Sequence, residues 1–294
     1  MHRYLRAIGF SKIEKRSELK KILNDVLQNP TERQYVSMSG DSIAVEYRKE
    51  FADSLGLSVC GSYEDDTEFD YEYYYPYFIG GNVSSSEDIV VERHAEKDSF
   101  AGICDDLKVG VSLIFYLQNR LDYIKQQNNN DSDKPIPNTS VNFAGLSVSG
   151  TIMLPLEKKP EQVIVTQKVE KNRTDLLAAA RKGDEEAMEN LTLDDMDTYN
   201  IISRKILKDD ILTLVDTYFM PYGVECDQYS VLGEISDVRV VLNQLTKEEI
   251  YIITLNCNDI TFDICINQKD LMGEPAVHRR FKGVVWMQGH INFS

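Results

Sequence analysis

Residues Ile250–Asn267 read IYIITLNC-ND-ITFDICIN, and this stretch decides the fold class. Apolar and polar residues alternate after Asn258-Asp259, which is the period of a β-strand, and an apolar-rich run precedes the pair. An Asn-Asp pair between two such runs is typical of a two-residue hairpin turn, because both residue types tolerate a positive φ. We therefore predict an antiparallel hairpin with strands over 250–257 and 260–267. Its buried face consists of Ile260, Phe262, Ile264 and Ile266.

The same period of two recurs in both directions from this hairpin. Ile43, Val45 and Tyr47 alternate with Glu46 and Arg48, which predicts a half-buried antiparallel strand. The order of strands after residue 229 resembles part of a small Greek-key barrel of the OB type. The further strands are expected over 55–63, 100–104, 109–123, 141–154, 211–220, 229–242 and 281–293.

The sequence contains fewer helical patterns than strand patterns. Apolar residues between Leu19 and Leu27 form one stripe, which Ser17 can cap and Asn29-Pro30 ends. A short helix is expected near residues 4–10, and the polar run 126–135 is expected to be a mobile loop. Capping residues and apolar stripes predict a larger helical block over 173–208.

These patterns predict an α+β protein. Two strand-rich, mainly antiparallel halves are expected, joined by the helical block. The charged, proline-containing stretch 157–171 is typical of a boundary. We therefore predict an N-terminal domain over 1–160 and a C-terminal domain over 161–294, with the helical block opening the second domain.

Charge and cysteine usage exclude several classes of function. The chain has 294 residues, a formal net charge of −16 and a pI near 4.7. Binding to nucleic acid or to an anionic membrane needs clustered Lys and Arg, so the net charge argues against both. No apolar stretch approaches the length of a spanning helix. The five cysteines are irregularly spaced without a CxxC motif, which favours free thiols in a reducing cytoplasm.

Motifs that carry catalytic chemistry are absent from the sequence. Glu92, His94 and Glu96 would share one face of a strand, but their charged neighbours favour a solvated surface over a metal site. Gly145–Gly150 lacks the glycine that a nucleophile elbow requires two residues after Ser147. We therefore predict no catalytic residues, no metal and no cofactor.

The most unusual composition is the acidic, tyrosine-rich run 63–75. One interpretation is a charged edge strand that is protected from aggregation; the others are a protein-docking edge and a mimic of phosphate charge. Alternation predicts Tyr71 and Tyr73 on one face, with Glu72 and Tyr74 on the other. The candidate binding residues are Asp70, Tyr71, Glu72, Tyr73 and Tyr74.

A second patch combines basic residues with the single tryptophan of the chain. Arg279, Arg280 and Lys282 precede Trp286. Basic and aromatic side chains together are typical of a ligand or anion site. The alternation of apolar residues over 281–287 equally describes a buried strand, so both interpretations stay open.

Three phrases carry a resemblance to a known family. They are MHRYLRAIGFSKI at the start, DTYFMPYGVECDQYSVLGEISDV, and NDITFDICINQKDLMGEP followed by RRFKGVVWMQG. The chain resembles an uncharacterised bacterial family, one of the domains of unknown function found in anaerobic Firmicutes, over nearly its whole length. The resemblance implies a cytoplasmic bacterial protein and carries over no catalytic residues.

Two hypotheses for function follow. The first is a non-catalytic cytoplasmic protein that binds another protein, which would be basic if it docks on the acidic segment. The alternative is a small-molecule sensor or an enzyme with a site between the two halves. A flat surface holding Tyr71, Tyr73 and Tyr74 would favour the first, and a deep pocket with converging polar groups would favour the second.

Overall fold

The computed structural model describes residues 1–38, 42–64, 68–93, 99–106, 112–129, 136, 138–155, 176, 179, 184 and 216–293. Strands dominate these residues and form two sheets, one of four strands and one of ten. In chain order, the strands are β1 (Glu32–Ser37), β2 (Ser42–Ala52), β3 (Leu55–Glu64), β4 (Glu68–Phe78), β5 (Ile89–Arg93), β6 (Phe100–Cys104), β7 (Leu113–Leu117), β8 (Asn138–Met153), β9 (Tyr218–Pro221), β10 (Gln228–Leu242), β11 (Glu249–Cys257), β12 (Ile260–Asn267), β13 (Leu271–Met272) and β14 (Arg280–Phe293).

The predicted hairpin is confirmed as β11 and β12. Asn258 and Asp259 have φ angles of 51° and 59°, the left-handed values that a two-residue hairpin turn requires. The predicted apolar face from Ile260 to Ile266 is fully buried. The two strands pair without a register shift from Cys257↔Ile260 to Ile250↔Asn267. The hairpin therefore provides two adjacent strands of a barrel.

Five strands close this barrel in the order β8–β12–β11–β10–β14, and β14 returns to β8. The β8–β12 pair is parallel, whereas the other four pairs are antiparallel. Long apolar side chains from all five strands fill its interior, including Phe143, Phe262 and Phe281. Because β8 comes from the first half of the chain, the barrel belongs to both halves.

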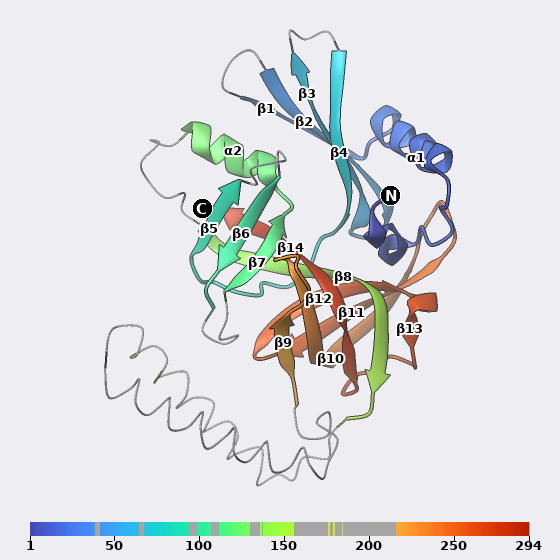
Figure 1. Ribbon diagram of the computed structural model, residues 1–294, viewed down its shortest axis with the longest axis vertical. Coiled ribbons are helices and arrows are strands. Elements are labelled where there is room, and N and C mark those ends of the chain that lie inside the picture. Colours follow the sequence, from blue (N-terminus) through green and yellow to red (C-terminus); the bar gives the residue numbers. More distant parts are fainter. Residues whose placement is uncertain are drawn as a thin grey trace.

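The large sheet extends beyond the barrel through β14, which pairs with β7 and so continues into β6 and β5. The second sheet has the order β1–β2–β3–β4 and is antiparallel throughout. Figure 1 shows this four-stranded sheet projecting from the barrel, with α1 and α2 on opposite sides of it. The helices are η1 (Arg3–Ile8, a 3-10 helix), α1 (Arg16–Gln28), α2 (Arg120–Asn129) and η2 (Gln268–Asp270, a 3-10 helix).

Alternation along β2 assigns its two faces to the two helices. Lys49 forms an ion pair with Asp25 of α1, so the odd-numbered residues of β2 face α1. Arg48 donates to the backbone of Gln118, which precedes α2, so the even-numbered residues face α2. We name the second surface, together with the residues of β3 and β4 that share it, the network face.

The fold-class prediction is wrong. The described residues are mostly β, with few helices, and strands from both halves share the ten-stranded sheet. No helical block joins two separate halves in the described part of the chain. The OB-like barrel expected within the second half alone is also wrong, because β8 is one of its five strands. Local periodicity does not encode this non-local pairing.

Several smaller predictions differ from the structure in their bounds or concern residues outside the described part of the chain. The helical block over 173–208 and the boundary near 160 lie almost entirely outside the described residues, and the division into domains stays a prediction. The strand expected over 109–123 is shorter, since β7 ends at Leu117 and α2 begins at Arg120. The first residues of the run expected to be a loop, 126–129, belong to α2. The helix expected from Ser17 is α1, with Lys15 as its N-cap residue.

Candidate functional site

The acidic, tyrosine-rich segment forms β4, an edge strand that pairs with β3 alone among the described residues. The register skips one residue: Tyr71 lies opposite Gly61, and Tyr73 lies opposite Cys60. Glu72 is therefore the extra residue of a β-bulge. Residues directly opposite each other share a face, so the bulge places Tyr71 and Tyr73 on opposite faces of the sheet. The predicted alternation is wrong at this point.

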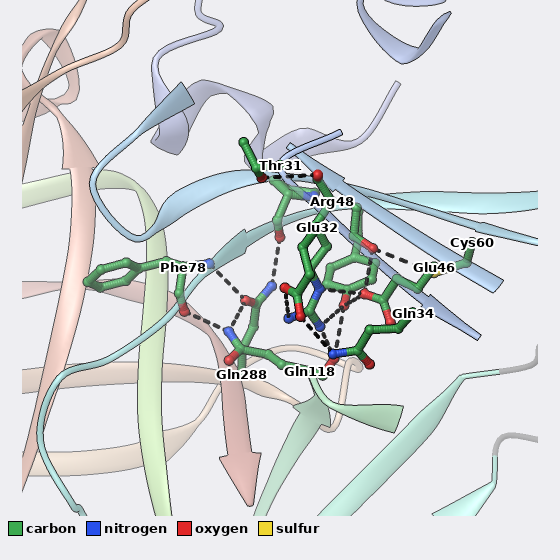
Figure 2. A network of polar contacts seen from close by, with 12 residues as sticks. Thr31, Glu32, Gln34, Glu46, Arg48, Cys60, Phe78, Gln118 and Gln288 are labelled. Atoms are coloured by element: carbon green, nitrogen blue, oxygen red, sulfur yellow. Dashed lines mark hydrogen bonds and ion pairs between the residues drawn. The ribbon is translucent and has the colours of Figure 1, made fainter. Parts of the chain in front are cut away.

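The network face buries an ionised carboxylate. Figure 2 shows Glu46 of β2 at the centre of a polar network. Its Oε1 accepts hydrogen bonds from Ser58 Oγ at 2.6 Å, Tyr75 OH at 2.7 Å and Arg48 Nε at 2.8 Å. Burial alone would raise the pKa of Glu46. The two nearby arginines and these hydrogen bonds outweigh burial, so the pKa of Glu46 lies below its ordinary value.

Arg48 connects the two sheets. Its Nη2 donates to the backbone oxygen of Gln118 at 2.5 Å, and its guanidinium lies 5.4 Å from the centre of the Tyr77 ring. Gln118 then donates to the Phe78 oxygen at 2.6 Å and to Gln288 Oε1 at 2.7 Å. This chain of contacts fixes the end of β4 against β7 and β14 (Figure 2).

Arg120 supplies a second buried cation at the start of α2. It lies 3.9 Å from Glu72 and 5.4 Å from the ring centre of Tyr73. The Tyr73 hydroxyl also bonds to Cys60 and Tyr116. Two of the predicted docking residues, Glu72 and Tyr73, are therefore directed into the network face.

The network has no activated nucleophile. Burial raises the pKa of the Cys60 thiol to about 12, so the thiol stays protonated at neutral pH. Within the described ranges, no group of three or more His, Cys, Asp or Glu side chains could hold a metal ion. The network can therefore hold the four-stranded and the ten-stranded sheet in a fixed orientation relative to each other.

The opposite face of the sheet is partly open beyond α1. Its outer end carries aromatic and apolar side chains that follow one another across all four strands. Ile43, Tyr63 and Phe69 lie directly opposite one another on β2, β3 and β4, and Tyr71 follows Phe69 on the same face. We name the set the distal aromatic patch: Tyr35, Ile43, Tyr63, Phe69 and Tyr71.

Ring contacts connect Tyr35, Phe69 and Tyr63 of the distal aromatic patch. Tyr47 links its members: the ring centres of Tyr47 and Phe69 are 5.5 Å apart, and those of Tyr47 and Tyr35 are 6.3 Å apart. The hydroxyls of Tyr47 and Tyr63 lie 2.9 Å apart. Tyr35 is 47% exposed and Tyr71 is 46% exposed, so the patch presents large aromatic side chains to solvent.

The other predicted residues of β4 divide between surface and interior. Asp70 is exposed, and the Tyr74 hydroxyl accepts a hydrogen bond from the His2 backbone at 2.8 Å. Of the five candidates, Asp70 and Tyr71 are thus the exposed ones. Sequence reasoning missed Tyr35 because it expected no strand over β1. The aromatic residues flanking the acidic run, Tyr63 and Phe69, were a usable signal for the patch.

The basic residues and the tryptophan of β14 do not form one site. Trp286 is buried, stacks on Tyr4 at 5.3 Å and donates to Asp227 at 2.6 Å. Arg280 is also buried and donates to the Leu154 backbone at 3.2 Å. Arg279 is half-buried and donates to the Glu274 backbone at 2.6 Å, and Lys282 is also half-buried. The buried-strand interpretation accounts for Arg280 and Trp286, while binding by this set stays a prediction.

In the part of the chain that the structure describes, no helix has both the length and the apolar character needed to cross a membrane.

Comparisons with known proteins place the chain in a family. Neither the curated proteins nor the solved structures contain a match to this sequence. Residues 5–289 match the family described as "Domain of unknown function, E. rectale Gene description (DUF3881)". The chain therefore belongs to this family of unknown function, as the resemblance of its three sequence phrases implied.

Proposed function

We propose that this protein binds another protein without catalysis, and that the distal aromatic patch receives a basic segment of the partner. The observation that carries this proposal is the exposure of Tyr35 and Tyr71 on one face of the sheet, where ring contacts join Tyr35 to Phe69 through Tyr47 and Tyr71 follows Phe69 along β4. Tyrosine offers a large, rigid contact area with a polar end, and it is enriched where proteins meet. Contact with a partner would remove the apolar part of these side chains from water, which is favourable.

Charge selects the class of partner. Glu64, Glu68 and Asp70 are exposed at the same end of the sheet as the patch, but the register places them on the network face, so a basic segment would reach them around the edge at β4. The formal net charge of −16 adds a long-range field that attracts cations. Arginine side chains can stack on tyrosine rings and pair with neighbouring carboxylates at the same time. The proposed partner therefore carries an Arg-rich or Lys-rich segment.

The strand order offers a second means of attachment. β1 and β4 are the edges of the four-stranded sheet, and among the described residues neither has a strand on its outer side. An extended segment can add to such an edge through main-chain hydrogen bonds while its side chains contact the face. The edge at β4 lies beside Tyr71 and Asp70, so both contributions are available to one segment.

The proposed compartment is the cytoplasm. All five cysteines are free thiols, and Cys226 is exposed. Free thiols persist where glutathione and thioredoxin keep the environment reducing.

The test compares a patch variant with a matched control. Tyr35→Ser combined with Tyr71→Ser removes the two exposed rings of the patch, whereas Tyr222→Ser removes a tyrosine that is also 46% exposed but lies elsewhere. Each protein is used to isolate partners from native lysate, and chemical crosslinking then maps the contact sites. We expect one partner to crosslink next to the patch through a basic segment, and to be lost from the patch variant alone.

Salt dependence provides a second readout. Exposed charge pairs are screened as ionic strength rises, so binding of a basic segment should weaken between 0.05 and 0.5 M salt, roughly the range where the Debye length falls below 10 Å. Equal recovery of every partner by the folded patch variant would contradict the proposal. So would a partner whose contact segment is acidic.

A further inference from the structure

A basic segment lies where α1 begins. Residues 12–21 read KIEKRSELKK and contain five basic and two acidic side chains, a local charge of +3 in a chain whose formal net charge is −16. Within the described ranges, no residue forms an ion pair with any of the five basic side chains. All five residues are exposed: Lys12, Lys15, Arg16, Lys20 and Lys21. We name residues 12–21 the basic segment.

The fold holds the basic segment in a defined shape. The Lys15 backbone N–H donates to Glu18 at 3.4 Å, which closes a capping box at the start of α1. Leu19 is buried and anchors the first turns of the helix. Arg16 and Lys20 are four residues apart, so they lie on the same side of the helix. Because the helix is already formed, a contact through these cations costs less entropy than a contact through a disordered tail.

α1 and the distal aromatic patch share one face of the four-stranded sheet. The ion pair between Lys49 and Asp25 places the odd-numbered residues of β2 toward α1, and Ile43 of the patch is one of these residues. Two surfaces on one face can each contact the other surface on a second copy that is related by a two-fold axis. Such a contact is made twice and closes at the dimer.

Charge decides whether a second copy is attracted. Two chains of net charge −16 repel each other at long range. At about 0.15 M ionic strength the Debye length is about 8 Å, so exposed charges farther apart than this are largely screened. The charges that meet in a contact are closer than the Debye length, and there the basic segment of one copy faces Glu64, Glu68 and Asp70 of the other. The local charges are therefore complementary where the overall charges are not.

We infer that the partner of the distal aromatic patch is a second copy of this chain, and that the basic segment of each copy contacts the patch of the other. This inference rests on the proposed function, because it names the partner of the same patch. Lysine and arginine side chains stack on Tyr35 and Tyr71 and reach Glu68 and Asp70 around the edge at β4.

Sedimentation of the full chain at about 0.15 M salt tests the inference. We expect the wild type to form a dimer as its concentration rises. Lys15→Glu combined with Lys20→Glu should weaken the dimer by about tenfold or more, because each reversal turns an attraction into a repulsion and counts twice in a two-fold dimer. Lys15→Arg combined with Lys20→Arg keeps the charge and is the matched control, which should dimerise as the wild type does. Acidic side chains are favourable in the first turn of a helix, so the reversed variant should fold, and thermal melting checks this.

A charge exchange makes the test specific for the two surfaces. Glu68→Lys combined with Asp70→Lys reverses the acidic side of the contact and should also give a monomer. An equal mixture of this variant with the Lys15→Glu, Lys20→Glu variant should restore the dimer, because opposite charges meet again in both contacts. A nonspecific change of solubility in either variant would not be repaired by mixing.

Three results would overturn the inference. They are a wild type that stays monomeric up to about 0.1 mM, a reversed basic variant that dimerises like the wild type, and a mixture of the two variants that stays monomeric. The Tyr35→Ser, Tyr71→Ser variant separates this failure from a failure of the proposed function. If the wild type is monomeric but captures a different basic protein that this variant loses, only the identity of the partner is wrong. If the patch variant binds every partner as the wild type does, the proposed function is wrong as well.

Discussion

The two faces of the four-stranded sheet differ in sequence pattern and in environment. On the network face, Glu46 is 1% exposed and Arg48 is 5% exposed, and both are enclosed by the β7–α2 connection. On the other face, Tyr35 and Tyr71 belong to an aromatic surface, yet nearly half of each side chain is in water. At these four positions, charged residues are inside and aromatic residues are outside, the reverse of the usual distribution.

This reversal shows that coverage by other elements, and not residue type, decides which face is buried. A buried ion network is tolerated where many hydrogen bonds satisfy it, and it fixes orientation more than it adds stability. An exposed aromatic surface contributes little to the folded monomer and remains available to a partner. One face therefore serves the architecture, and the other is the better candidate for recognition.

The largest expected effect comes from breaking the network face. Glu46→Ala removes the buried carboxylate that accepts from Arg48 Nε, and loss of one partner of a buried ion pair costs about 3–5 kcal/mol. Urea denaturation should show this loss in the free energy of unfolding. Glu50→Ala, an exposed position on the same strand, should change it by less than about 0.5 kcal/mol. Equal effects of the two substitutions would mean that the network does not hold the sheets together.

A smaller loss is expected from crowding the aromatic side. A Cβ atom at Gly61 would lie 2.1 Å from the Asp70 backbone oxygen and 2.6 Å from the Phe69 ring. Gly61→Ala should therefore displace Phe69 and lower the free energy of unfolding by up to about 3 kcal/mol, the usual limit for overpacking. The neighbouring Ser62→Ala on the network face is the control in the same denaturation experiment. A fully stable Gly61→Ala protein would show that Phe69 does not pack on Gly61.

The free energy of unfolding is expected to depend on pH through Glu46 of the network face and through Glu248. The folded-state pKa of Glu46 lies below its ordinary value of 4.5, and the same holds for Glu248, which binds Ser11, Asn267 and Lys269. The unfolded chain binds more protons as the pH falls, so the stabilisation is complete above pH 4.5 and is lost as the pH falls through the folded-state values.

We expect the free energy of unfolding to decrease by on the order of 1–2 kcal/mol between pH 6 and pH 3.5. Urea titrations at each pH measure it. Glu248→Gln removes one of the two titrating groups and should flatten the curve. Stability that rises as the pH falls across this interval would contradict the assigned direction of both pKa shifts.

The smallest effect on stability belongs to the patch. Tyr35→Ser with Tyr71→Ser should change the free energy of unfolding by less than about 1 kcal/mol, because both side chains are largely solvated. Tyr75→Phe on the network face removes a single hydroxyl but should cost about 1–2 kcal/mol, since that hydroxyl donates to buried Glu46. Parallel thermal and urea unfolding compare them. A larger loss from the double patch variant would show that the aromatic surface is part of the core.

Local sequence rules predicted the elements better than their assembly. The hairpin at Asn258-Asp259, the long strand β10 and the C-terminal strand β14 follow from a period of two and from turn chemistry. The pairing of β8 with β12 and β14 could not be predicted, because it joins residues more than 100 positions apart, and local periodicity does not encode the partner. The predicted arrangement of two separate halves failed for this reason, whereas the α+β class failed because the described residues contain few helices.

The sequence pointed to the strand that carries the candidate docking residues but not to the faces on which they lie, and their role in binding stays a prediction. The acidic run led to β4, and Tyr71 is exposed there as a docking surface requires. The bulge at Glu72 shifted the alternation, so Tyr73 turned toward Arg120. In the same way, the pattern of β2 indicates that Glu46 and Arg48 face solvent, whereas both are buried. Nothing in β2 itself shows that another element covers them. Residues that depend on distant neighbours are the ones that sequence patterns misplace.

The double role of β14 has a consequence for the time course of folding. This strand pairs with β8 and β10 in the barrel and with β7 in the extension, so residues 280–293 join three strands at once. Contacts between such distant positions form late, because closing a long loop costs entropy before the contacts repay it. The pairing of β14 with β8 and β7 spans a much longer stretch of chain than its pairing with β10, so it is expected to form later. Until β8 and β7 pair with it, β14 has an unpaired edge that is open to aggregation.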